Sequence, residues 1–274
     1  MKVGVALGGG GVRGFAHVLA LQTIDACGIV PEALAGTSMG AIIGALYASG
    51  RKGTGIRAFV EEHVIEEDDK LEDLFKKRDR LIKWLSALRP AWEGSGLMKA
   101  DGFLHYLLDE IRAERFEDLE IPLRVVATDF HRGEPVVFDT GELLPAILAS
   151  MSIPGIYVPV EHEGRVLVDG GLVDNLPYDL LDDCDVTIAV DVAPTRDPDE
   201  TEPPNMIDAT IGMFDIFVER AVDRMREQRP PTVYLRPRFT GIRTLDFEKA
   251  ETVFEQARPA MEELREALER LGRS

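Results

Sequence analysis

The stretch Val3–Gly14, VGVALGGGGVRG, joins an apolar run to four consecutive glycines. Residues Val3–Leu7 are typical of a strand buried on both faces, and a helical pattern begins at about Gly14. Glycine loses more backbone entropy on folding than any other residue, so four in succession indicate a tight bend or a backbone that something approaches closely. We therefore expect a strand, a glycine loop and a helix in direct succession.

Strand-like and helical segments alternate along most of the chain, which favours a single α/β domain with a mainly parallel central sheet flanked by helices. The predicted strands are Val3–Leu7, Ala33–Ala35, Leu123–Phe130, Glu134–Phe138, Arg165–Val168, Asp185–Val192 and Thr232–Leu235. The predicted helices are Gly14–Cys27, Met39–Ser49, Gly141–Ser150, Met206–Arg226 and a terminal amphipathic helix that contains Pro259. Residues from about 53 to 111 have a polar helical pattern without strand runs, so we expect a helical, cap-like insertion there.

Composition and charge exclude several classes of protein. The 274 residues, 45% of them hydrophobic, can bury a large core. A formal net charge of −18 opposes binding to nucleic acid and general adhesion to anionic membranes. The two cysteines, Cys27 and Cys184, lie far apart without metal-ligand spacing, and no apolar run approaches the length of a membrane span. We expect a soluble, cytoplasmic protein without a disulfide framework.

The glycine loop has three interpretations. Its spacing Gly9-x-Gly11-x-x-Gly14 matches the dinucleotide-binding pattern, but that fold would want an acidic residue at the end of the second strand, where this chain has GTSMG. Alternatively, its free N–H groups, at the positive end of a helix, bind an oxyanion that forms during a reaction. The third interpretation is a tight turn without chemistry.

The segment GTSMG, Gly36–Gly40, is a G-x-S-x-G sequence between a predicted strand and a predicted helix. In that context the central serine lies on a strained turn and presents its hydroxyl, while the glycines avoid clashes around it. Ser38 is therefore our candidate nucleophile, and the alternative is a serine that only caps the helix.

A nucleophilic serine needs a base, and histidine is the usual one. None of the five histidines occupies a strand-end loop that would aim it at Ser38: His17, His63, His105, His131 and His162. Asp169 ends an apolar strand and precedes Gly170 and Gly171. A carboxylate has a pKa of about 4 in water but accepts a serine proton more readily in a cleft that excludes water. Asp129 and Asp191 also end strands and compete for the role, and Asp169 has the alternative of capping a turn.

The motifs GGGGVRG, GTSMG and DGG, in this order and with SIPG at 152–155, resemble those of the patatin-like phospholipase family. The similarity spans roughly residues 3–192 and continues through DGGLVDNLP at 169–177. It implies a serine–aspartate dyad in which Ser38 is the nucleophile and Asp169 the base. It further implies an oxyanion loop at Gly10, Gly11 and Arg13, where Arg13 braces the loop, supported by Gly9, Gly14, Gly36, Gly40, Gly170 and Gly171.

The resemblance implies an acyl hydrolase of the phospholipase A or lysophospholipase kind, which cleaves carboxylic esters of lipids through an acyl-enzyme. No metal or organic cofactor is implied. Residues 1–200 would form the catalytic domain, and a helix, strand and helix in residues 201–274 would complete it. The alternative is a non-catalytic regulatory or nucleotide-binding module that retains the fold.

Residues 76–92, KKRDRLIKWLSALRPAW, hold six basic residues, one acidic residue and both tryptophans. Apolar residues recur in this stretch at helical spacing. One interpretation is a helix that docks on a lipid surface, which would make the protein peripheral at the membrane. The other is a cap helix whose apolar stripe packs on the domain.

Overall fold

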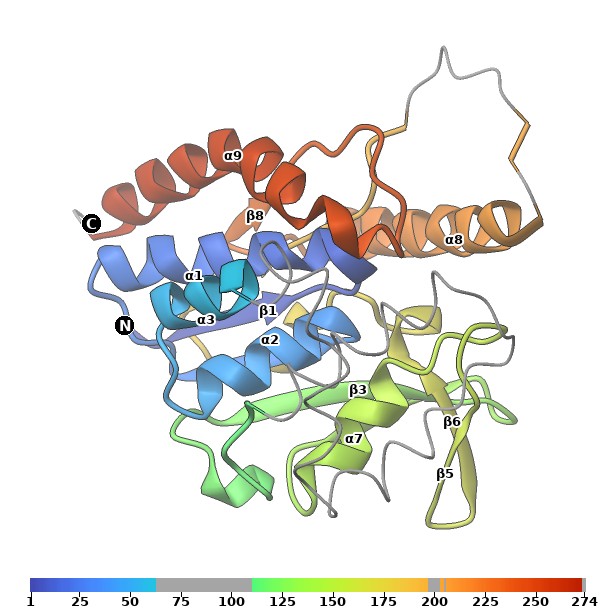
Figure 1. The fold of residues 1–274 in the computed structure, drawn as a ribbon. Helices are drawn as coiled ribbons and strands as arrows, with labels where there is room; N and C mark the ends of the chain where they lie inside the picture. Colours follow the sequence, from blue (N-terminus) through green and yellow to red (C-terminus); the bar gives the residue numbers. More distant parts are fainter. Residues whose placement is uncertain (63–109, 197–202, 205, 273–274) are drawn as a thin grey trace.

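The computed structural model describes residues 1–62, 110–196, 203–204 and 206–272 (Figure 1). In these residues, eight strands form one sheet in the order β5-β6-β3-β2-β1-β7-β8, with β4 also paired to β3. The strands are β1 (Val3–Leu7), β2 (Ala33–Thr37), β3 (Leu123–Asp129), β4 (Glu134–Phe138), β5 (Val160–His162), β6 (Arg165–Asp169), β7 (Val186–Val190) and β8 (Val233–Leu235). The α-helices are α1 (Ala16–Ala26), α2 (Met39–Ala48), α3 (Gly53–Val60), α7 (Leu143–Ser150), α8 (Met206–Gln228) and α9 (Ala250–Leu271).

The sheet is mixed, with a parallel part and an antiparallel end. Strands β8, β7, β1, β2 and β3 are parallel neighbours. Strands β4 and β6 pair antiparallel with β3, and β5 pairs antiparallel with β6. The prediction of an α/β fold with a mainly parallel sheet is confirmed. Strand β5 was not predicted, because three residues of mixed polarity give no periodic signal.

The two faces of the sheet carry side chains of different size. Val5 and Leu7 of β1 pack into the main core with residues of α1, α2 and α9, and α9 lies along α1 (Figure 1). Ala6 points to the other face, where a second cluster includes Ala189 of β7 and Val222 of α8. Large side chains thus support the helix layer, while small ones let α8 and its neighbours approach closely.

The expected helical insertion begins with α3, which follows α2 directly. Most of it, including the basic segment 76–92, lies outside the described residues, so the two interpretations of that segment stay predictions. The same holds for the division of the chain at residue 200. Among the described helices, none combines the length and hydropathy that a membrane span requires.

Helix α2 can approach β1 closely because residue 40 is glycine and has no side chain. A Cβ atom added at Gly40 would lie 2.0 Å from the carbonyl oxygen of Leu7. Real Cβ atoms do not approach backbone this closely, so α2 would have to shift away from the sheet. Since α2 begins one residue after Ser38, this contact fixes the position of Ser38.

We expect Gly40→Ala to lower the free energy of unfolding by about 3 kcal/mol or more, since the added methyl group meets backbone that cannot yield. Gly212→Ala is the matched control, because its added Cβ in α8 meets no described atom within 4 Å. That control should raise stability by about 0.5–1 kcal/mol. Thermal unfolding measures both, and equal effects of the two substitutions would contradict the packing argument.

Candidate active site

The edge of β3 brings Ser38 and Asp169 together. Strand β3 pairs with β4 along Val125–Asp129, so β2 and β6, which overlap that range, both lie on its opposite edge. On that edge Val126 pairs with Thr37, the last residue of β2, and the next residue, Ala127, pairs with Asp169, the last residue of β6. Strand β6 thus continues along β3 where β2 leaves it. The residue after β2 therefore meets the end of β6.

Ser38 has a strained backbone at the turn between β2 and α2. Its φ of 54° and ψ of −123° lie in a region that residues other than glycine rarely adopt. The Ser38 amide donates to Oγ of Ser150 (2.9 Å), and its carbonyl accepts from the amide of Ala41 (2.9 Å). The side chain makes no capping hydrogen bond to α2. The structure thus argues against a helix cap as the reason for this serine.

Asp169 is 2% exposed, and Oδ1 of its carboxylate accepts a hydrogen bond from the amide of Gly171 (2.8 Å). Burial raises the pKa of Asp169 from its ordinary value of 3.8 to about 6, while the Gly171 amide and the nearby Ser38 side chain act in the opposite direction. Asp169 is thus a buried carboxylate next to Ser38, and it is mostly ionised at neutral pH.

The competing carboxylates lie in other settings. Oδ1 of Asp129 accepts from the amides of His131 and Arg132, so this residue caps the turn after β3. Asp191 accepts from the amide of Ala193 and from the hydroxyl of Tyr234 (2.6 Å). These donors engage both competing carboxylates, whereas Asp169 is the carboxylate that lies next to Ser38.

The glycine loop passes directly beside Ser38. A Cβ added at Gly9 would lie 3.1 Å from Cβ of Ser38. The amides of Gly8 and Gly9 donate to the carbonyls of Val190 and Asn175, but those of Gly10 and Gly11 have no acceptor among the described residues. Both residues are partly exposed. Two backbone donors are therefore available to a ligand next to the Ser38 hydroxyl.

The described histidines do not supply a base for Ser38. His17 is fully buried, and its Nε2 lies 2.7 Å from the carbonyl oxygen of Gly8. Burial lowers the pKa of His17 to about 4, so the ring stays neutral and holds the glycine loop. His131 and His162 pack edge-on against Phe130 and Phe138. His63 and His105 lie outside the described residues.

Two residues that sequence reasoning missed connect the loops of the site. The side-chain amide of Asn175 donates to the backbone carbonyl of Gly9 (3.1 Å), and the backbone carbonyl of Asn175 accepts from the Gly9 amide (3.1 Å). The side-chain hydroxyl of Ser150 accepts a hydrogen bond from the Ser38 amide. Two residues later, the backbone carbonyl of Ser152 accepts one from the Asp169 amide (2.9 Å). Asn175 belongs to the DGGLVDNLP stretch, but nothing in the sequence indicates which loop it binds.

In the described part of the chain, no group of three or more His, Cys, Asp or Glu residues has the arrangement of a metal site. Cys27 and Cys184 are both free thiols.

Comparison with known proteins adds three findings. A family model described as patatin-like phospholipase matches residues 5–182. An uncharacterized NTE family protein of Mycobacterium tuberculosis is 33% identical over 232 residues, which are 81% of this chain and 60% of that protein. Lysophospholipase NTE1 of Saccharomyces cerevisiae is 27% identical over 277 residues, 92% of this chain and 16% of that protein. This chain thus spans about three fifths or less of these relatives.

Among solved structures, the crystal structure of VipD from Legionella pneumophila has a TM-score of 0.51 and 14% sequence identity. The alignment covers 96% of this chain and 67% of VipD. At this identity the likeness concerns the fold.

Alanine is usually more stable than glycine in an ordered backbone, but the strain at Ser38 predicts the opposite order for Ser38→Gly and Ser38→Ala. Glycine adopts the observed backbone angles without strain, whereas alanine retains the penalty. Ser38→Gly should therefore be more stable than Ser38→Ala by about 1 kcal/mol, after the entropic cost of glycine. At Ser49, where φ is −79°, the same pair should show alanine equal or more stable. Chemical denaturation measures both pairs, and the same order at both positions would contradict the strain.

Proposed function

Because the chain belongs to the patatin-like phospholipase family, we propose that it is an acyl hydrolase that cleaves carboxylic esters of lipids. One observation carries the proposal. The side chain of Ser38 lies close enough to the buried carboxylate of Asp169 to lower its pKa, beside a loop whose Gly10 and Gly11 amides have no described acceptor. These are the parts that ester hydrolysis requires: a nucleophile, a base and donors for an oxyanion.

In the first step, Oγ of Ser38 attacks the carbonyl carbon of the ester while its proton passes to the carboxylate of Asp169. The carbonyl electron pair moves onto oxygen, and the amides of Gly10 and Gly11 donate to that oxyanion. When the tetrahedral intermediate collapses, the proton on Asp169 passes to the departing alkoxide. An acyl group is then bound to Ser38 and the alcohol is free.

In the second step, water takes the place of the alcohol. Asp169 accepts a proton from that water as its oxygen attacks the acyl carbon, and the proton returns to Ser38 as the carboxylic acid leaves. The burial that raises the pKa of Asp169 to about 6 makes it a stronger base than a solvated aspartate while leaving it ionised at neutral pH.

The amides act mainly in the transition state. Negative charge on the carbonyl oxygen develops only during attack, so donors fixed around it lower the barrier more than they strengthen substrate binding. Loss of one such donor typically costs about 3 kcal/mol of transition-state stabilisation. Gly9, held through its own amide and carbonyl by Asn175, keeps this part of the loop in place.

Apolar side chains on α8 and next to Asp169 suit an acyl chain. The ring of Phe214 in α8 would lie 3.3 Å from a Cβ added at Gly171, next to Asp169. Helix α8 exposes four large apolar side chains, and Leu172 beside the base is also exposed: Met206, Met213, Ile216, Phe217 and Leu172. Exposed apolar groups of this kind favour a lipid over a polar ester.

The choice of lipid to test first comes from the names of the relatives. A relative that aligns with 92% of the chain is named a lysophospholipase, so a lysophospholipid is the first substrate to test. Contact with a membrane surface through residues 76–92 stays a separate prediction.

A fluorophosphonate probe tests the proposed roles, because it phosphonylates only an activated serine. Wild-type protein should be labelled, Ser38→Ala should not, and Asp169→Asn should react about 100-fold more slowly or less. Ser49→Ala, which changes a serine at the other end of α2, is the control that should label normally. Labelling that persists in Ser38→Ala, or its absence in folded wild-type protein, would overturn the proposal.

A further inference from the structure

The side chain of Arg13, in the 3-10 helix Gly11–Phe15 that follows the glycine loop, is 1% exposed. Its Nε donates to the carbonyl of Val192 (3.1 Å) and its Nη1 to that of Ile242 (3.4 Å). Its Nη2 reaches both carboxylate oxygens of Asp215 in α8, at 3.2 and 3.3 Å. The guanidinium therefore joins the loop to the segment after β7 and to two segments in the C-terminal part of the chain, beyond residue 200.

Asp215 is the anionic member of this arrangement. A buried guanidinium retains its charge and needs a counter-charge in place, because removing one partner of a buried ion pair leaves the other uncompensated. The contact of Nη2 with both carboxylate oxygens also restricts the direction of the Arg13 side chain. Asp215 thus fixes the orientation of Arg13 as well as neutralising its charge.

The loop also rests directly on the backbone of the C-terminal part. The amide of Val12 donates to the carbonyl oxygen of Thr244 (3.0 Å). A Cβ added at Gly11, whose φ is +58°, would lie 2.1 Å from that same oxygen. Gly10 and Gly11 are therefore flanked by Asn175, which holds Gly9, and by contacts to Thr244 and Asp215 on the other side.

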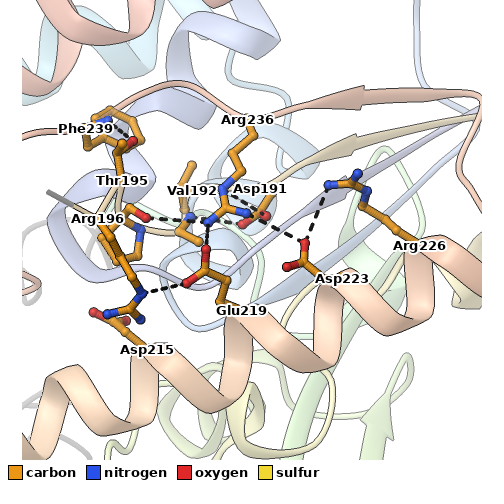
Figure 2. A network of polar contacts seen from close by, with 12 residues as sticks. Asp191, Val192, Thr195, Arg196, Asp215, Glu219, Asp223, Arg226, Arg236 and Phe239 are labelled. Carbon is orange, nitrogen blue, oxygen red and sulfur yellow. Dashed lines mark hydrogen bonds and ion pairs between the residues drawn. The ribbon is translucent and has the colours of Figure 1, made fainter. Parts of the chain in front are cut away.

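Helix α8 also carries an acidic side chain whose ion pairs do not involve Arg13. Figure 2 shows Asp215 and Glu219 on this helix. Glu219 pairs with Arg236, which follows β8, at 2.7 Å and with Arg196 at 3.0 Å. These pairs attach the same helix to the sheet without contacting Arg13.

We propose that Asp215 is a positioning residue for ester hydrolysis: through Arg13 it sets the direction of the Gly10 and Gly11 amides toward the oxyanion. The inference rests on the proposed function. Asp215 and Thr244 both lie beyond the segment 5–182 that the family model matches. On this proposal, residues beyond the matched segment contribute to catalysis.

Asp215→Asn tests the inference, with Glu219→Gln as the matched control on the same helix. Each is compared with wild type for unfolding temperature, for kcat and KM on a soluble short-chain p-nitrophenyl ester, and for the rate of fluorophosphonate labelling. Asp215→Asn should lower kcat and the labelling rate about 10- to 100-fold with KM within about twofold, because the amides act mainly in the transition state. Glu219→Gln should lower the unfolding temperature but retain kcat.

Two further readouts separate positioning from loss of structure. The pH dependence of kcat/KM in Asp215→Asn should keep its midpoint, because Asp169 is untouched. Asp215→Glu, which restores the charge on a longer side chain, should recover part of kcat. If Asp215→Asn does not fold, Asp215→Glu takes its place against Glu219→Gln, and its kcat should be the lower of the two.

The results distinguish this inference from the proposed function. If wild-type protein is not labelled at Ser38, the proposed function itself fails. If wild type is labelled and Asp215→Asn has wild-type kcat, or if kcat in the two variants falls in step with their unfolding temperatures, only the role of Asp215 fails.

Discussion

The edge of β3 is the constraint from which the site follows. Strand β2 pairs with this edge as far as Val126 and then turns into α2, and β6 arrives from the opposite direction to pair with the next position, Ala127. The last pairing of β2 and the pairing of Asp169 in β6 therefore fall on consecutive residues of β3. A shift of either strand by one residue would turn its side chains to the other face of the sheet and separate Ser38 from Asp169. Backbone hydrogen bonds of the sheet thus fix the distance between a hydroxyl and a carboxylate far apart in sequence.

Backbone strain and a buried charge destabilise the site, and hydrogen bonds from its surroundings offset this destabilisation. Ser38 has a backbone conformation that residues other than glycine avoid, and Asp169 is a buried charge that pairs with no cationic side chain of the described residues. Hydrogen bonds from the Ser38 amide to Ser150 and from the Asp169 amide to Ser152 hold both backbones to one short segment at the C-terminal end of α7. Strain and desolvation of this kind persist only where the structure over-determines them.

The sequence predicted the elements better than their contacts. Strands β1 and β4 have the predicted bounds because apolar runs bounded by turn residues identify them locally. The neighbouring positions of Thr37 and Asp169 on β3 were beyond prediction, since pairing of β6 depends on tertiary structure. Ser38 and Asp169 were nominated through motifs and a family resemblance, and the family is confirmed. Asn175, Ser150 and Asp215 were missed because they act on residues more than 100 positions away, where no sequence spacing indicates a partner.

In the proposed mechanism, ionised Asp169 takes the proton of Ser38. The pH dependence of kcat/KM on a soluble ester tests this role most directly. Below about pH 6 the rate should fall about tenfold per pH unit as Asp169 becomes protonated, and above it the rate should level off. Asp174 provides the control, because burial and the nearby Asp179 raise its pKa to about 7. Asp174→Asn should leave the midpoint in place. A rate without inflection between about pH 5 and pH 8, or an inflection that disappears in Asp174→Asn, would contradict the account.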